Sequence, residues 1–440
     1  MTGTATKEKL DRSIGPGALA LAIINTVVGS GIFVIPAIIS DGLGASAILA
    51  YLVCGVVVFL VGLCFAELGS RTDISGGTYT YIEKAFGPFA GFLASSVYWL
   101  GGSVAADAAV ANVLVGFLKI FFPVLGDETV RIIFIFIVFA SLTLLNVRSS
   151  KGGIRLVQFT AIGKLLPLVL LVLVAVPHVD AANLRWDITP TAGNVGKASL
   201  LLFFAFVGME APLSNGGEIK NPARTVPLGI LVGIGCVLLL YISIQLMTQG
   251  VLGASINTYR AAPLAAVADV AIGQVGSKLI VATSAMSVLG MLAGEIFSIP
   301  RIIFASARDG LMPRPFAKVH PRFATPHVAI IFYAFLGFVL AVSGSFELLA
   351  VLSSASVLLI YFGVMMATLR FKLRDKSSRQ GFKVPGGPVI PAIGGVAVAW
   401  VLSNLALKEL KAMLVFIAAL SVIYFINKVW KRKVVVIPPG

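Results

Sequence analysis

Long apolar runs alternate with short polar segments along almost the whole chain. A run of about 20 apolar residues is long enough to cross the roughly 30 Å hydrocarbon core of a bilayer as a helix. Most charged residues fall in the segments between the runs. The pattern therefore predicts an all-α integral membrane protein with twelve spans, at residues 14–38, 45–68, 87–118, 131–147, 154–176, 198–216, 226–251, 277–306, 327–343, 346–369, 388–406 and 411–430.

The composition excludes a soluble globular protein. Of the 440 residues, 58% are hydrophobic and only 12% are charged, whereas soluble domains carry about 25% charged residues. Most of the 34 Lys and Arg residues lie in connections that face the cytoplasm if the N-terminus is inside. This distribution follows the positive-inside rule and predicts that both termini are cytoplasmic. The net charge of +15 is thereby explained, and we expect a lipid bilayer and no nucleic acid as a partner.

The order of the spans predicts one domain built from two repeats. Residues 1–13 are polar and lack a small-residue cleavage site, so we expect a cytoplasmic tail and not a signal peptide. Residues 14–440 form the single membrane domain, with repeat one at 14–176, repeat two at 198–369 and accessory helices at 388–430. Each repeat has an odd number of spans, so the second is inverted in the membrane relative to the first.

Two spans contain residues that interrupt a helix. The first span carries Gly29-Ser30-Gly31, and the sixth carries Gly208 followed by the carboxylate of Glu210. Backbone groups freed by such a break must be buried or must face a watery cavity. Small residues also serve helix packing, so one break alone leaves both interpretations open. Two breaks at matching positions in the two halves favour a binding site at the repeat interface.

Four motifs, taken together and in order, resemble signatures of the amino acid–polyamine–organocation transporter family. They are Gly29-Ser30-Gly31-Ile32-Phe33, then Glu67–Arg71 with Ser75–Tyr79 and Tyr81, then Phe203–Glu210 with Glu218–Pro227, and finally Pro300-Arg301 with Ala307–Pro313. Within the family, the chain resembles bacterial amino acid permeases and cationic amino acid transporters. The resemblance implies a leucine-transporter-like fold, which is a five-plus-five inverted repeat with broken helices 1 and 6 and two C-terminal helices.

The resemblance also implies a function, which is proton-coupled uptake (symport) of an amino acid by alternating access across the inner membrane of a bacterium. An exchanger of a cationic amino acid for its amine, in the manner of polyamine exchange, stays open as an alternative. In a different class, a non-transporting amino acid sensor or a channel also stays open. A channel would favour rings of polar residues in several spans, and a sensor would favour an added soluble domain; the sequence has neither.

The resemblance implies that the amino acid binds between the two breaks, with its carboxylate at the first break and its ammonium at the second. The substrate carboxylate would meet the free N–H groups and the positive dipole end of the outer half of span 1. The ammonium would meet free carbonyl groups in span 6, where Phe204 resembles an aromatic gate. For the phenylalanines, simple packing is the alternative. The substrate-binding residues expected on this basis are Thr26, Gly29, Ser30, Gly31, Phe203, Phe204, Ala205 and Gly208. Glu295 is expected to join them, although it lies where the family often has a small residue.

Three ionisable residues inside apolar runs are candidates for coupling and selectivity. Lys164 lies in span 5, where an ammonium is expensive and marks a functional site. It resembles the lysine that replaces a sodium ion in proton-coupled relatives, so we expect proton coupling at Lys164 with Asp107 as a partner. A permanent ion pair is the alternative. Glu295 in span 8 could attract a cationic substrate, could titrate, or could pair with Lys164 or Asp107.

The remaining polar candidates are expected to gate or to support the fold. Glu67, Arg71, Arg308 and Asp309 lie at cytoplasmic helix ends and could latch the inner gate by exposed ion pairs. Glu210 is expected to hold the unwound stretch of span 6 by accepting from backbone N–H groups.

The sequence points to no enzyme and to no accessory chain. No spacing of nucleophile and base, or of metal ligands, suggests an enzyme, a metal or another cofactor. Cys54, Cys64 and Cys236 all fall in apolar runs, so we expect no disulfide-linked heavy subunit.

Overall fold

The computed structural model describes residues 14–71, 78–148, 164–213, 219–308, 312–374 and 382–435. Within these ranges the chain is helical, and the one extended pairing is an isolated bridge between Ile14 and Ile219. The α-helices are α1 (Pro16–Val27), α2 (Gly31–Ser40), α3 (Ile48–Arg71), α4 (Thr78–Phe86), α5 (Pro88–Ser96), α6 (Ala105–Lys119), α7 (Glu128–Arg148), a helix at Lys164–His178, α9 (Ala192–Leu202), α10 (Glu210–Leu213), α11 (Pro222–Leu252), α12 (Pro263–Arg308), α13 (His327–Ser343), α14 (Phe346–Arg374), α15 (Val389–Leu402) and α16 (Leu407–Val435).

Short helical segments of other types connect or extend several of these helices. A π-helical segment, η2, runs without a break from α5 into α6. The others are 3₁₀ turns. These segments are η1 (Gly44–Ala47), η2 (Val97–Val104), η3 (Pro123–Gly126), η4 (Val176–His178), η5 (Ala181–Leu184), η6 (Phe203–Phe206), η8 (Gly253–Tyr259) and η9 (Arg314–Ala317).

The described helices match a membrane protein by length and composition. Seven of them are long and apolar enough to cross a bilayer, and α1 with α2 makes an eighth span that is bent by 57°. Four shorter apolar helices accompany them, at Lys164–His178, Ala192–Phe206, His327–Ser343 and Val389–Leu402. Most of these helices begin and end within a few residues of a predicted span because the hydropathy of each run reports its own burial in lipid or protein. The helix Ala192–Phe206 begins and ends earlier than the predicted span 198–216, and residues 154–163 of the fifth predicted span lie outside the described residues.

Two further segments differ from the predicted spans. The connection between the predicted spans 45–68 and 87–118 contains a helix, α4, which packs against α5 and α14. Helix α12 begins at Pro263, about one-third of its length before the predicted span, and bends at Gly273 (φ 73°). Leu264 and Val267 in this early part are buried, so tertiary packing extends a helix that hydropathy alone assigned to a loop.

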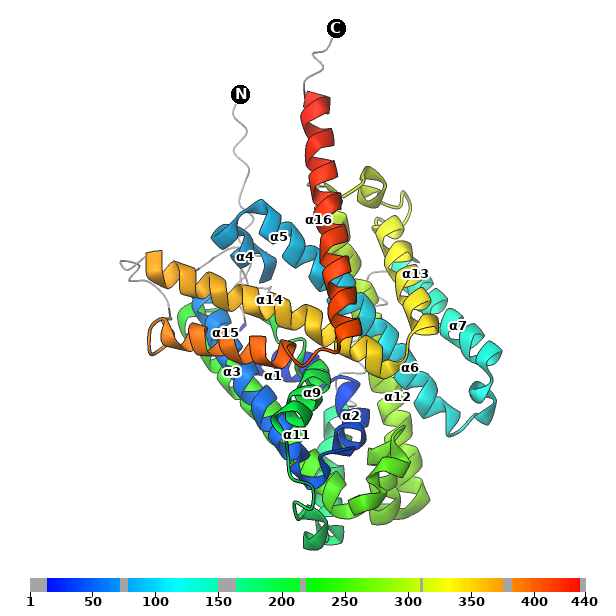
Figure 1. Ribbon diagram of the computed structural model, residues 1–440. Coiled ribbons are helices and arrows are strands. Elements are labelled where there is room, and N and C mark those ends of the chain that lie inside the picture. The colour runs from blue at the N-terminus through cyan, green and yellow to red at the C-terminus, as the bar shows by residue number, and fades with distance from the viewer. Residues whose placement is uncertain are drawn as a thin grey trace.

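Helices α1 and α2 lie in the middle of the bundle and are covered by α11 on one side (Figure 1). Small residues of α11 allow α1 to approach closely. A Cβ added at Gly229 would lie 2.7 Å from the Leu19 side chain, and one added at Gly233 would lie 3.0 Å from that of Ile23. Close backbone approach at glycine is the usual way in which membrane helices gain packing energy.

The last helix, α16, stands at the edge of the bundle, and its red end projects past the neighbouring helices (Figure 1). Leu407 and Val415 are 75% and 69% exposed. In a bilayer such a face is covered by lipid, so its exposure is consistent with a membrane-spanning helix and requires no protein partner.

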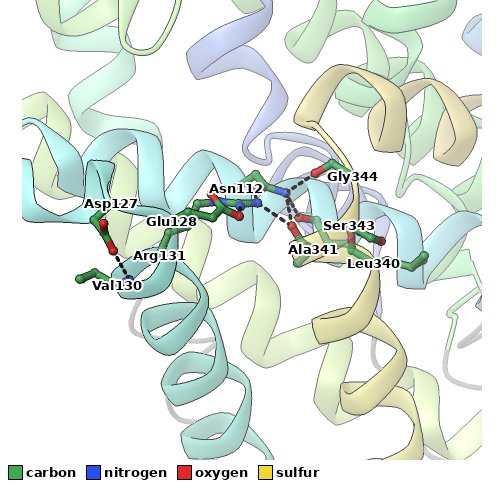
Figure 2. A network of polar contacts seen from close by, with 10 residues as sticks. Asn112, Asp127, Glu128, Val130, Arg131, Leu340, Ala341, Ser343 and Gly344 are labelled. Atoms are coloured by element: carbon green, nitrogen blue, oxygen red, sulfur yellow. Dashed lines mark hydrogen bonds and ion pairs between the residues drawn. The ribbon is translucent and has the colours of Figure 1, made fainter.

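A polar cluster joins α6, α7 and the end of α13 (Figure 2). Arg131 at the start of α7 donates to Asn112 Oδ1 on α6 at 2.9 Å and to the carbonyl of Ala341 at 3.0 Å. The amide of Asn112 in turn donates to the carbonyls of Ala341 and Gly344. Glu128 pairs with Arg131. The cluster satisfies carbonyls that the end of α13 leaves without helical partners.

Candidate functional site

The first span is broken at the predicted place. Helix α1 ends at Val27, α2 begins at Gly31, and the two axes differ by 57°. The first N–H groups of α2 have no acceptor inside their own helix. The hydroxyl of Ser30 is buried and has no hydrogen-bond partner among the described residues. The break therefore presents unused donors in the interior, which is the arrangement that binds an anion.

The sixth span is broken at Gly208, the glycine that marks the interruption in the sequence. The 3₁₀ turn η6 ends at Phe206, Val207 is extended, and α10 begins at Glu210. Gly208 has a φ of 117°, and a Cβ there would lie 3.0 Å from the carbonyl oxygen of Thr26. Glycine is required at this position because the backbone is left-handed and because the two broken helices touch.

A tyrosine that sequence reasoning did not single out links the two breaks. The hydroxyl of Tyr241, on α11, donates to the carbonyl of Ala205 at 2.8 Å and lies 3.0 Å from the carbonyl oxygen of Val27. Tyr241 is fully buried. The carbonyl of Ala205, a residue expected to bind substrate, therefore already accepts one hydrogen bond from within the protein.

Phe203 and Phe204 are packing residues in this structure. Phe203 makes an edge contact with Tyr361, with ring centroids 5.8 Å apart, and Phe204 makes one with Phe346 at the same separation. Both are buried, and neither lines the cavity described next. The position of the break at Val207–Met209 explains the difference, since η6 keeps residues 203–206 coiled.

A cavity of about 230 Å³ lies beside both breaks. The π-helical segment η2 contributes Tyr98, Gly102 and Ser103, and π-helical segments are frequent at functional sites. The lining residues are Asn25, Thr26, Gly29, Tyr98, Gly102, Ser103, Ala106, Lys164, Val207, Gly208, Glu210, Ala211, Ser287, Gly290, Met291, Gly294, Glu295, Ser298, Ile299 and Val357. The cavity thus gathers glycines, hydroxyl groups, one ammonium and two carboxylates.

Several expected substrate residues meet in this cavity. Thr26, Gly29 and Gly208 line it. A Cβ at Gly29 would lie 3.0 Å from Met291 Sδ, so Gly29 keeps the space beneath the α1–α2 break open. Gly31 does not line the cavity; it packs against Ala205, whose Cβ would be 2.9 Å from a Cβ at Gly31. Gly31 therefore closes the joint between α2 and η6.

Lys164 reaches the end of α1 from the helix Lys164–His178. Its Nζ donates to the carbonyl oxygen of Asn25, and the residue lines the cavity. Among the described residues no carboxylate lies within ion-pair distance of this ammonium. The alternative of a permanent ion pair between Lys164 and Asp107 or Glu295 is therefore not formed in this structure.

The two candidate carboxylates occupy different places. Glu295 lines the cavity from α12. Asp107 is fully buried on α6, and Tyr333 of α13 donates to its Oδ2 at 2.9 Å. The residue before it, Ala106, faces the cavity, so the helix directs Asp107 to α13 instead. The structure brings Glu295 and Lys164 to one cavity and leaves Asp107 outside it.

Glu210 lies at the start of α10 beside the break in span 6. Its Oε2 accepts from the N–H of Gly208 at 3.3 Å and from the hydroxyl of Tyr361 at 2.5 Å. These contacts connect the unwound stretch to α14, and Glu210 also contributes to the wall of the cavity.

Glu67, one of the residues predicted to gate, does not form an exposed ion pair. Glu67 is 1% exposed, and its Oε2 lies 2.8 Å from Lys372 Nζ of α14 while accepting from the N–H of Val384 at 2.8 Å. The expectation of an exposed pair at Glu67 is wrong, because the connection before α15 folds over the end of α3. Arg308 is exposed at the end of α12. The side chain of Arg71 and all of Asp309 lie outside the described residues.

The sequence did not single out several residues that line the cavity from η2 and α12. Tyr98, Ser103, Ser287 and Met291 lie in long apolar runs. Their signal is a polar or flexible side chain within such a run, and such side chains also occur at packing positions.

Broken helices that present free donors beside an interior cavity define a membrane transporter, and comparison with known proteins specifies which kind. The family model described as amino acid permease matches residues 14–435. The chain therefore belongs to the amino acid permease family, a family of transporters and not of enzymes, and is a multi-pass membrane protein.

Three relatives from Bacillus subtilis (strain 168) match nearly the whole chain. The serine/threonine exchanger SteT is 28% identical, with 95% of this chain and 98% of the relative covered. The branched-chain amino acid permease BcaP is 26% identical, with coverage of 97% and 95%. A methylthioribose transporter is 25% identical, also with coverage of 97% and 95%.

Proposed function

We propose that this permease is a secondary active transporter that takes up an amino acid together with protons by alternating access. The bent pair α1–α2, the seven long helices and the four shorter apolar helices add up to twelve spans under this proposal. The first ten form two inverted repeats of five, and both termini are cytoplasmic. The protein then works alone in the bacterial inner membrane, with amino acid, protons and lipid as its partners.

The substrate binds between the two breaks. Its carboxylate accepts from N–H groups at the α1–α2 break beside Gly29, which lines the cavity. The neighbouring Ser30 does not line the cavity, but its buried hydroxyl has no partner among the described residues and is the further donor of this proposal. Its ammonium is accepted by carbonyl groups of the second break at Val207 and Gly208, which line the cavity. The side chain then points toward Ser103, Met291 and Glu295, so these residues set the preference for substrate.

The observation that carries the coupling proposal is the contact between Lys164 and Asn25. A charged ammonium makes a stronger hydrogen bond to a carbonyl than a neutral amine does. While protonated, Lys164 holds the end of α1 against the helix Lys164–His178. Loss of the proton to the cytoplasm weakens this contact and allows α1 to swing, which opens the inner side and releases the substrate.

The test is uptake into proteoliposomes with an imposed inward proton gradient. Lys164→Gln removes the exchangeable proton and keeps most of the volume, so accumulation against a gradient should be lost and the pH dependence of uptake should flatten. Substrate binding should remain, because Lys164 is assigned no substrate contact. Lys408→Gln, at an exposed position on α16, is the matched control. A Lys164→Gln protein that still concentrates substrate with the same response to the gradient rules out this coupling site.

Exchange is the second candidate function. It is favoured by the similarity to SteT, whose name describes a serine/threonine exchanger. Proteoliposomes preloaded with unlabelled amino acid distinguish the two modes. Symport predicts uptake into empty vesicles when a proton gradient is imposed. Exchange predicts uptake only into preloaded vesicles, whatever the gradient.

A further inference from the structure

A second cavity lies on the outside of the bundle, between α7 and α13. It has a volume of about 360 Å³ and is lined by six residues of α7, from Phe136 to Val147, and by four of α13, from Ile331 to Phe338. Among these ten residues only Thr143 has a polar side chain. No part of this groove belongs to the substrate cavity.

The groove is closed at its base by buried residues and is open on its outer side. Phe139 and Ala334 form the floor and are buried, whereas Phe136 and Phe335 form the walls and are 56% and 58% exposed. A Cβ at Gly337 would lie 2.7 Å from the Phe139 ring, so the two helices touch beneath the groove. Its open side therefore faces the surroundings of the bundle, which in a membrane are lipid chains.

The length of the groove matches one leaflet. Val147 follows Phe136 by eleven positions of the helix, which corresponds to about 16 Å along α7. This is close to half of the roughly 30 Å hydrocarbon core. A helix of another protein would follow both leaflets, whereas an acyl chain follows one. The dimensions therefore favour a lipid over a second protein.

The end of the groove is cationic. The carbonyl of Val147 accepts from the hydroxyl of Thr325 at 2.7 Å, which holds the connection between η9 and α13 against this end. Arg148 follows directly and is exposed, and Arg322 lies three residues before Thr325. Residues 312–326 contain no Asp or Glu. Within the described part of the chain neither arginine pairs with a carboxylate.

We propose that this groove binds one anionic phospholipid, with an acyl chain between α7 and α13 and the phosphate at Arg148 and Arg322. Basic residues at the membrane surface beside a gap between helices are the arrangement that attracts anionic head groups. The apolar lining supplies the chain site, and the two guanidinium groups supply the preference for a negative head group.

The experiment compares phosphatidylglycerol with phosphatidylcholine on the purified full chain by native mass spectrometry and by thermal unfolding. The wild type should retain one phosphatidylglycerol in preference to phosphatidylcholine, and this lipid should raise the unfolding temperature. Arg148→Gln with Arg322→Gln should reduce retention on the order of tenfold. Ala140→Trp, which fills the groove, should reduce retention of both lipids.

Two matched controls keep the test specific. Lys408→Gln with Lys411→Gln removes two exposed charges elsewhere, and Leu414→Trp adds a ring to exposed α16; neither should change retention. Equal retention of the two lipids by the wild type would overturn the head-group site. Unchanged retention in Ala140→Trp would overturn the chain site. A dimer that Ala140→Trp disrupts would show that a second copy of the chain, and not a lipid, occupies the groove.

Discussion

At the scale of single residues, two glycines of the first break have different surroundings. Gly29 and Gly31 are separated by one residue, yet they do different things. Gly29 borders the cavity opposite Met291, while Gly31 lets α2 pack against Ala205. Only Gly29 lines the cavity, so the two positions should respond differently to substitution.

Gly29→Leu should abolish substrate binding while leaving the protein inserted and folded. The added side chain would occupy the space between the α1–α2 break and Met291, where the carboxylate is proposed to bind. The measurement is substrate-induced thermal stabilisation, because a ligand that binds only the native state raises its apparent stability. Gly116→Leu, at a glycine of α6 with open space around it, is the control. Normal binding by Gly29→Leu would place the carboxylate elsewhere.

Glu295→Gln tests which side chains the cavity selects. A carboxylate in the cavity wall favours a cationic ligand, so its neutralisation should weaken arginine, lysine or ornithine at least tenfold more than alanine or leucine. Binding constants for these five amino acids are compared between the variant and the wild type. Asp269→Asn, at an exposed position on α12, should change none of them. An equal loss for every ligand would assign Glu295 to protonation or to support of the fold.

At the scale of elements, the two broken helices form one unit through Tyr241. The sequence indicates both breaks, because glycine in an apolar run is a local signal. It does not indicate that both breaks contact the Tyr241 hydroxyl. A tyrosine within a span has the same sequence pattern whether it only packs or also donates a hydrogen bond. The exact position of the second break, at Val207–Met209, is likewise set by tertiary contact, here between Gly208 and Thr26.

Tyr241→Phe should destabilise the protein by about 1–3 kcal/mol, because it leaves a buried carbonyl without its donor. The ring and its edge contact with Phe206 are retained, so the loss reports the hydroxyl alone. Thermal unfolding of the purified variant in one detergent measures it. Tyr259→Phe, at an exposed residue, should be neutral. An unchanged unfolding temperature for Tyr241→Phe would mean that water or another donor replaces the hydroxyl.

At the scale of the whole molecule, hydropathy predicted the helices well and the connections poorly. Each apolar run reports its own environment, whereas α4 and the early part of α12 are held by packing against other helices. Local sequence also failed to predict the environment of Glu67. Its position at the end of a helix suggested exposure, but the side chain is buried. Its partner Lys372 is about 300 residues away in sequence, and no local pattern links the two.

Lys372→Met should cost roughly 3–5 kcal/mol, because it removes the cation from a buried carboxylate. The double variant Glu67→Gln with Lys372→Met should recover part of this loss, since neither charge then remains. Thermal unfolding of the three proteins provides the comparison, with Lys408→Met as the exposed control. A double variant no more stable than Lys372→Met would indicate that Glu67 is held mainly by its other contacts.

The hydroxyl of Tyr241 also bears on how faithfully the protein can transport. Because it contacts the carbonyls of Val27 and Ala205 together, α1 and η6 are linked at the level where each helix breaks. If the two broken helices moved independently, both sides of the protein would at times be open together. Ions would then cross the membrane down their gradient without substrate. Under the proposed mechanism, a hydroxyl that holds both breaks makes such states rare, so Tyr241 would limit how much of the proton gradient is lost without transport.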